Sequence, residues 1–230
     1  GRTISAIAGE KAGIIKPRTP VITGARQRAA IEVIRQTAKD RTAPFYRVGE
    51  HFRVRRNPSA GIFTYYGMEH VWPNMQTRLT GNHQIDNAAI VLAACEVLKR
   101  KHTIDFSAIQ TGLKTNQWPG RLEMRETRPR ILIDGAHNLM AARHLARFLK
   151  EQMADRKITL VIGILDDKPY RSMLQSILPQ CHRAVFTRPR IDRSLSAEAL
   201  AKSGKSMIQD FDVIADVADA VAHAYRTTDP

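Results

Sequence analysis

The chain has 230 residues, of which 43% are hydrophobic, and a formal net charge of +14. This length suits one large domain or two modest ones, and the composition is that of a globular protein, which excludes disordered and fibrous classes. The longest wholly apolar run, Ala88 to Cys95, is far shorter than the roughly 20 residues that cross a bilayer. Two distant cysteines in apolar contexts, Cys95 and Cys181, indicate buried thiols in a reducing compartment. We therefore expect a cytoplasmic protein without a membrane partner.

The positive charge is concentrated in the first part of the chain. Residues 1–125 carry 20 basic and 9 acidic side chains, whereas residues 126–230 carry 16 and 13. A positive surface suits a nucleotide, a phosphate, a polycarboxylate or a nucleic acid. The arginine-rich run 53–56 could belong to a nucleic-acid patch, but it lacks interleaved exposed aromatics and any nucleic-acid-binding signature. A solvated face of a sheet is the favoured interpretation of that run.

The first half of the chain predicts helices around a β-rich segment. Thr3 is a plausible N-cap for a helix that Gly13 would end. Aromatic and β-branched residues over 45–66, with turn signals at Asn57-Pro58 and Gly61, predict a β-hairpin or meander. The remaining periodicity predicts a short strand over 20–24 and helices over 29–40, 85–101 and 106–113.

The second half repeats strands that are each followed by a helix. It begins after the break at Trp118-Pro119-Gly120, and we place the domain boundary near residue 126, giving domains 1–125 and 126–230. Alternating strands and helices predict an α/β fold with a parallel, doubly wound sheet. Strands are expected over 131–133, 158–165, 184–187 and 207–208, and helices over 139–153, 173–178, 197–202 and 213–225.

The sequence contains no phosphate-binding P-loop of the pattern G-x-x-x-x-G-K-[ST]. Its nearest match, Gly204-Lys205-Ser206, follows a helical pattern and has Ala199 where the first glycine belongs. Gly204 is therefore expected to be a helix C-cap. The chain begins at Gly1 without an initiator Met and ends at Pro230 directly after a helical pattern, so we expect a piece of a longer protein.

Two polar groups in the first half stand out against apolar helices. Lys11 lies at the end of an apolar helix, where it is either half of a surface pair with Glu10 or a lysine in an enclosed position. Burial would lower its pKa and make it chemically modifiable. Asn87 shares a helix face with His83, four residues earlier. Its amide could read the edge of a purine, whereas His83 is also explained as a satisfied polar group beside an Asn82 N-cap.

Two further groups stand near the boundary. Arg121 follows Gly120 at the interdomain break. Its guanidinium can bind phosphate through two parallel hydrogen bonds, although a surface arginine beside a linker is equally plausible. The segment Asp134-Gly135-Ala136-His137-Asn138 runs directly from a hydrophobic strand towards a helix. Ligands of open α/β sheets bind at the carboxyl ends of strands, so this segment is favoured as a site over a mere cap and turn.

Taken together and in this order, the motifs resemble folylpolyglutamate synthase/dihydrofolate synthase, the folate branch of the Mur ligase superfamily. The resemblance covers essentially the whole chain and has weaker matches at Asp167-Lys168 and Thr187-x-Pro189-Arg190. The blocks that carry it are Gly1-x-Thr3-Ile4-x-x-Ile7-Ala8-x-Glu10-Lys11-Ala12-Gly13-Ile14-Ile15-Lys16, Gly81-x-His83-Gln84-x-x-Asn87-Ala88, Pro119-Gly120-Arg121-Leu122-Glu123 and Asp134-Gly135-Ala136-His137-Asn138.

The resemblance implies a role for each matching residue. Lys11 matches a lysine that the family carbamylates, and the carbamate helps to hold Mg²⁺. Asn87 matches a residue at the nucleotide base, and Arg121 matches an arginine that contacts phosphate. Asp134 matches a residue near the ribose and the incoming glutamate, and His137 matches a residue of the glutamate site. Lys11 and His137 are therefore the expected catalytic residues, and Asn87, Arg121 and Asp134 the expected ATP-binding residues.

The resemblance also implies a fold and an activity. Residues 1–125 would be the C-terminal part of a P-loop-type ATPase domain, and residues 126–230 a Rossmann-like ligase domain without its last strand. The whole enzyme would use ATP and Mg²⁺ to join L-glutamate to dihydropteroate or folate through an acyl phosphate. We expect a monomer that takes no nucleic acid. Since the family's P-loop and folate loops precede the Lys11 block, this chain alone is expected to be inactive. Another Mur-type amino-acid ligase and a basic nucleic-acid-binding module remain the alternatives.

Overall fold

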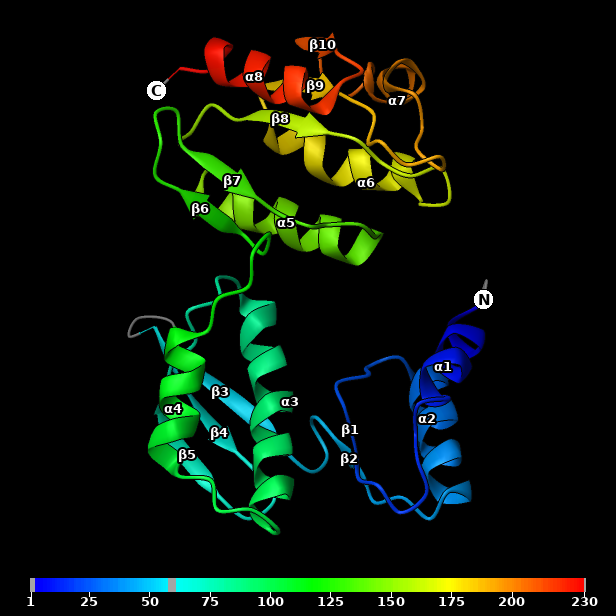
Figure 1. The fold of residues 1–230 in the computed structure, drawn as a ribbon, viewed down its shortest axis with the longest axis vertical. Helices are drawn as coiled ribbons and strands as arrows, with labels where there is room; N and C mark the ends of the chain where they lie inside the picture. The colour runs from blue at the N-terminus through cyan, green and yellow to red at the C-terminus, as the bar shows by residue number, and fades with distance from the viewer. Residues whose placement is uncertain (1–2, 58–60, 230) are drawn as a thin grey trace. The chain divides into compact units, whose positions relative to one another are not determined.

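The computed structural model describes residues 3–57 and 61–229, and it divides into two compact units, residues 1–117 and 118–230 (Figure 1). The division falls between Gln117 and Trp118, eight residues before the boundary expected from the sequence. The reason is a strand that the sequence did not reveal. β6 (Glu123–Arg125) pairs antiparallel with β7 (Ile131–Ile133) and so belongs to the second unit.

The first unit begins with two helices and two short parallel strands. α1 (Ile4–Ala12) starts at the expected N-cap, where Thr3 Oγ1 accepts a hydrogen bond from the Ala6 amide at 3.2 Å. β1 (Val21–Thr23) and α2 (Arg28–Asp40) follow, and β2 (Phe45–Arg47) pairs in parallel with β1. The segment at Phe45 was therefore wrongly assigned to the meander.

The rest of the first unit is a three-stranded meander covered by two helices. β3 (Arg53–Asn57), β4 (Ile62–Tyr66) and β5 (Val71–Met75) are antiparallel in that order. α3 (Asn82–Lys99) and α4 (Phe106–Thr115) lie on one face of this sheet (Figure 1). The core between sheet and helices contains Phe63, Tyr65, Trp72, Leu92 and Ile109.

The meander contains an edge strand that the sequence pattern did not predict. β5 was missed because Pro73 interrupts its pattern, and proline is tolerated there since β5 is an edge strand. The expected turn at Asn57-Pro58 runs into residues 58–60, which lie outside the described residues. Gly61, at the end of that segment, has a φ of +63°, as a turn glycine should.

The second unit contains the expected parallel sheet. Its strands are β8 (Thr159–Ile162), β9 (Arg183–Phe186) and β10 (Phe211–Val213), in the order β10-β9-β8. The helices are α5 (Leu139–Gln152), α6 (Tyr170–Ile177), α7 (Ala197–Gly204) and α8 (Val217–Thr227), with a 3₁₀ turn at Leu178–Gln180. The strand expected over 207–208 was wrong, because β10 forms at 211–213 and Ile208 packs into the core instead.

Alternation along β9 explains why both faces of this sheet are covered. Ala184 and Phe186 face a core made with α5, α6 and α7, whereas Val185 packs on Ala220 and Ala224 of α8. Figure 1 shows α8 and α6 on opposite sides of the strands. The sheet is therefore doubly wound, although β7 pairs with β6 and is not one of its hydrogen-bonded strands.

Gly204 does not act as the expected C-cap. It is the last residue of α7, and Lys205 occupies the cap position. A Cβ on Gly204 would lie 2.7 Å from Cζ of Phe186, so the glycine allows α7 to approach β9 closely. The absence of a side chain at Gly204 therefore allows α7 to pack closely on β9, and Gly204 does not terminate the helix.

The two cysteines are free and half-buried, and they lie in different units. Burial raises the pKa of both thiols, that of Cys181 to about 12, so neither is an activated nucleophile. Among the described residues, no helix is both long and apolar enough to cross a membrane.

A polar network joins the start of β9 to β10 and α8. The Asp212 carboxylate accepts from Arg183 at 2.6 Å and contacts His223 Nε2 at 2.9 Å. Burial of Asp212 opposes ionisation, but the hydrogen bonds from Arg183 and His223 outweigh it and lower the pKa of Asp212 below its ordinary value of 3.8.

A stability measurement checks this network. The Asp212→Asn variant should lose about 1–2 kcal/mol of unfolding free energy at pH 7, because the charge-assisted bonds disappear. A lowered native pKa contributes stability above the ordinary value, and that contribution is lost as the pH falls through the native value. Urea unfolding monitored by circular dichroism should therefore show the difference from wild type shrinking below about pH 4. A pH-independent difference would contradict this account.

Candidate functional site

The candidate site in the second unit is a pair of loops, one before β6 and one after β7. In the first loop, Gly120 has a φ of +72° and Leu122 a φ of +48°, so Arg121 lies between two left-handed residues. The Gly120 carbonyl accepts a hydrogen bond from the Gly135 amide at 2.7 Å. This bond ties the arginine loop to the loop that follows β7.

Asp134 fastens the two loops together. Its Oδ2 accepts from the Leu122 amide at 3.0 Å, and its Oδ1 accepts from the Ala136 amide at 3.0 Å. A carboxylate has about four acceptor positions, so both oxygens keep capacity for a ligand. Asp134, at the expected end of the strand, therefore also fixes the backbone next to Arg121 through the Leu122 amide.

His137 lies at the exposed end of the second loop. Its Nδ1 is 2.9 Å from the carbonyl oxygen of Gly135. Because a carbonyl only accepts, this contact places the proton of a neutral imidazole on Nδ1 and makes Nε2 an acceptor, which lies 3.5 Å from Asn138 Nδ2. Asn138 then caps α5, accepting from the Ala141 amide at 2.9 Å, and so fixes where the loop ends.

Arg121 is half-buried, and its side chain has no hydrogen-bond or ion-pair partner among residues 3–57 and 61–229. A Cβ on Gly135 would be 3.9 Å from Arg121 Nη1, which places the guanidinium over the loop that carries Asp134 and His137. A partly desolvated guanidinium without a counter-charge favours an anion. The structure thus brings together three of the predicted residues: Arg121, Asp134 and His137.

Asn87 lies in the other unit, on the exposed side of α3. Its Nδ2 donates to Oε1 of the buried Gln84 at 3.0 Å, which orients the amide. The start of α3 is held by the neighbouring Asp86, which pairs with Arg26 at 2.9 Å and with Arg56 of β3. The expected Asn82 N-cap is replaced by Gly81, with a φ of +104°. Within the described residues, the Asn87 side-chain amide thus bonds to Gln84 on its own helix.

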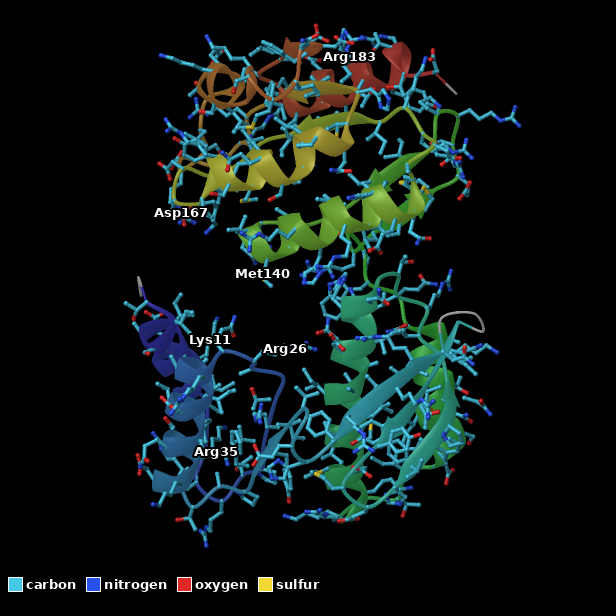
Figure 2. The ribbon with its side chains drawn as sticks, turned by 180° about the vertical axis from the view of Figure 1, so that it is seen from behind. Lys11, Arg26, Arg35, Met140, Asp167 and Arg183 are labelled. Carbon is cyan, nitrogen blue, oxygen red and sulfur yellow. The ribbon has the colours of Figure 1, made fainter. Side chains whose placement is uncertain are left out.

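Lys11 is exposed at the end of α1, where Figure 2 labels it. The enclosed position that the sequence left open for Lys11 is therefore not formed by the described residues. These residues also contain no group of three or more His, Cys, Asp or Glu that could hold a metal ion. By themselves they do not form a Mg²⁺ site.

Sequence reasoning missed the carboxylate that supports the arginine loop. Glu123 Oε2 accepts from the Gly120 amide at 2.8 Å, and its Oε1 pairs with Arg125 at 2.6 Å. The available signal was the motif itself, since Glu123 closes the block Pro119-Gly120-Arg121-Leu122-Glu123. A glutamate three residues after a glycine is too common to have been singled out alone.

The second unit matches a known protein family, and the whole chain has curated relatives. Residues 120–230 match the family described as Mur ligase, glutamate ligase domain. The dihydrofolate synthase/folylpolyglutamate synthase of Bacillus subtilis is 36% identical over 92% of this chain and 51% of its own length. The chain spans about half the length of the curated relatives it matches.

Solved structures give the same result. The folylpolyglutamate synthase of Thermotoga maritima superposes with a TM-score of 0.78 at 32% identity, over 96% of this chain and 53% of that one. The folylpolyglutamate synthase of Mycobacterium tuberculosis, complexed with ADP, gives a TM-score of 0.88 at 29% identity, over 98% and 52%. The second unit is therefore a Mur ligase glutamate ligase domain. Within that class, the chain belongs to the folylpolyglutamate synthase/dihydrofolate synthase family.

Proposed function

We propose that this chain supplies the glutamate-ligase half of an ATP-dependent enzyme that joins L-glutamate to dihydropteroate or a folate. The observation that carries the proposal is the loop pair of the second unit. It holds Arg121, which has no side-chain partner among the described residues, close to the loop that carries Asp134 and His137 at the end of β7 in a glutamate ligase domain. A guanidinium without a counter-charge among the described residues and an exposed histidine whose Nε2 can accept a proton suit a reaction between a phosphorylated acid and an amine.

The proposed reaction has two steps. A carboxylate oxygen of the folate takes the terminal phosphoryl group of ATP, giving an acyl phosphate and ADP. The neutral amine of glutamate then attacks the carbonyl carbon; the C–N bond forms, the C–O bond to phosphate breaks, and phosphate leaves with that electron pair and with the second proton that the nitrogen loses. Arg121 would stabilise the charge on the phosphoryl oxygens. His137 Nε2 would accept the proton that the glutamate ammonium loses, because Nδ1–H is held by Gly135.

The first unit would contribute Asn87 and Lys11. Asn87 presents an exposed, oriented amide, which can hydrogen-bond a purine edge. Lys11, as a neutral amine, could add CO₂ with loss of a proton to form a carbamate, which supplies two carboxylate-type oxygens. These two roles rest on the family motifs, and the structure supports only the orientation of Asn87.

The proposal is tested with a chimaera in which this chain follows the amino-terminal half of the Bacillus subtilis relative. The chimaera should release ADP only when ATP, L-glutamate and either dihydropteroate or a folate are all present. The 230-residue chain alone should show no turnover, because it contains no P-loop sequence. A panel of other acids and amino acids distinguishes the Mur-type alternatives. Turnover by the chain alone, or a chimaera that folds and binds ATP but ligates only other substrates, would overturn the proposal.

We further propose a monomeric, cytoplasmic enzyme that does not act on nucleic acid. Two arginines of β3 are engaged within the unit, since Arg53 lies 4.9 Å over the Tyr66 ring and Arg56 pairs with Asp86. The half-buried free thiols suit a reducing compartment. Light scattering should give the mass of one chain, and DNA should not be retained at moderate salt. Dimer mass, or tight binding to duplex DNA with a steep salt dependence, would contradict this proposal.

A further inference from the structure

Glu123 is built into the arginine loop through both of its carboxylate oxygens. One accepts from the Gly120 amide at 2.8 Å, and the other pairs with Arg125 at 2.6 Å. Only 24% of the Glu123 side chain is exposed, so its contacts are less screened than those of an open surface pair. The carboxylate therefore fixes the residue that directly precedes Arg121.

The backbone around Arg121 needs such support. Gly120 and Leu122 are both left-handed, and a left-handed leucine is unfavourable unless other contacts hold it. Leu122 is held by its own burial and by the bond from its amide to Asp134. On the other side, Gly120 is held through its amide by Glu123 and through its carbonyl by Gly135.

We propose that Glu123 is a positioning residue for anion binding: its bond to the Gly120 amide fixes the turn that presents the unpaired Arg121 guanidinium. The inference rests on the proposed role of Arg121 at a phosphate group. A guanidinium that is already in place binds an anion without the entropy cost of ordering the loop. Glu123 never touches the anion in this account, because it acts through the backbone of residue 120.

The negative charge of Glu123 and its positioning role predict opposite effects on anion affinity when Glu123 is made neutral. Glu123 is a negative charge two residues from Arg121, so its neutralisation strengthens the attraction of an anion by Coulomb's law. If Glu123 positions Arg121, the same substitution weakens anion binding because the loop must be ordered again. Glu126 gives a matched control, since it is exposed, has no partner among the described residues and differs from Glu123 in not touching the loop.

The experiment measures inorganic phosphate binding to the 230-residue chain by NMR, using the backbone amides of residues 120–122 and 135–137. The E123Q variant should bind phosphate about fivefold more weakly, because its neutral amide oxygen accepts a weaker hydrogen bond from the Gly120 amide and the ion pair with Arg125 is lost. The E126Q variant should bind it equally or slightly more tightly, and R121A should lose the binding. Unchanged thermal unfolding and unchanged shifts at the Asn138 cap would show that the domain remains folded.

The results for the variants separate the role of Arg121 in phosphate binding from the positioning role of Glu123. If R121A binds phosphate as wild type does, the proposed role of Arg121 fails. If R121A loses binding while E123Q binds equally or more tightly, the role of Arg121 stands and the positioning role of Glu123 is overturned. Hydrogen exchange in the wild-type chain tests the proposal even if E123Q does not fold. The Gly120 amide should be protected, and exchange at the rate of an open loop would contradict the inference.

Discussion

Replacing Glu96 with alanine is expected to destabilise the first unit by about 3–5 kcal/mol, since it leaves several buried donors without an acceptor. Glu96 has no exposed surface although it lies on α3, and its oxygens accept from four groups at 2.8 to 3.2 Å. These donors are the hydroxyl of Tyr65 and the amides of Met68, Glu69 and His70. The carboxylate thus anchors the whole turn between β4 and β5 to α3.

Urea unfolding followed by tryptophan fluorescence measures this effect. Trp72 is 5% exposed and stacks on Tyr65, whereas Trp118 is 63% exposed, so a large fluorescence change reports on the first unit. Glu69→Gln is the control, because it removes only an exposed pair with Arg100 and should cost at most about 1 kcal/mol. Equal stability of the Glu96→Ala and Glu69→Gln variants would show that the turn does not depend on the buried carboxylate.

Replacing Arg121 with alanine in the chimaera is expected to lower kcat/KM by about 100-fold or more, the typical effect of deleting a group that stabilises transition-state charge. The reason is that Arg121 has no partner among the described residues and faces the loop that carries Asp134 and His137. The loss should appear mainly in kcat, because the charge on the phosphoryl group and its leaving oxygen grows in the transition state.

A nearby arginine provides the control for this prediction. Arg130 is exposed directly before β7 and has no partner among the described residues. Arg130→Ala makes the same change in charge away from the loop pair and should alter kcat/KM by less than about twofold, as is usual for an isolated surface substitution. Steady-state measurement of ADP release gives both values. Similar losses in the two variants would indicate a general charge effect instead of a specific contact.

The sequence predicted the second unit better than the first because strand–helix alternation is a local signal. Hydrophobic periodicity placed α5 and the strand before Asp134 within a residue or two of the structure. It failed where long-range pairing decides the outcome. β2 joins β1 instead of the meander, and β6 pairs with β7, because each three-residue strand exists only through its partner.

In the candidate site, too, residues marked by a local sequence signal could be predicted, and residues whose role depends on long-range contacts could not. Asp134 and His137 could be recognised because a polar run directly follows a hydrophobic strand. Glu96 and Glu123 could not, because a glutamate on a helix or in a loop is normally solvated, and only the fold shows which amides it accepts from. For Lys11 the sequence left two alternatives open, a surface position and an enclosed one, and the described residues leave its side chain exposed.

The central claim is that this chain completes a ligase that works through an acyl phosphate, and oxygen transfer tests it most directly. The chimaera is given ATP, L-glutamate and a folate or dihydropteroate whose reacting carboxylate is labelled with ¹⁸O. If the carboxylate is phosphorylated and the amine displaces phosphate, each released phosphate carries one labelled oxygen, and one amide bond forms with it. Amide formation with unlabelled phosphate, or ADP release with no amide, would contradict the account.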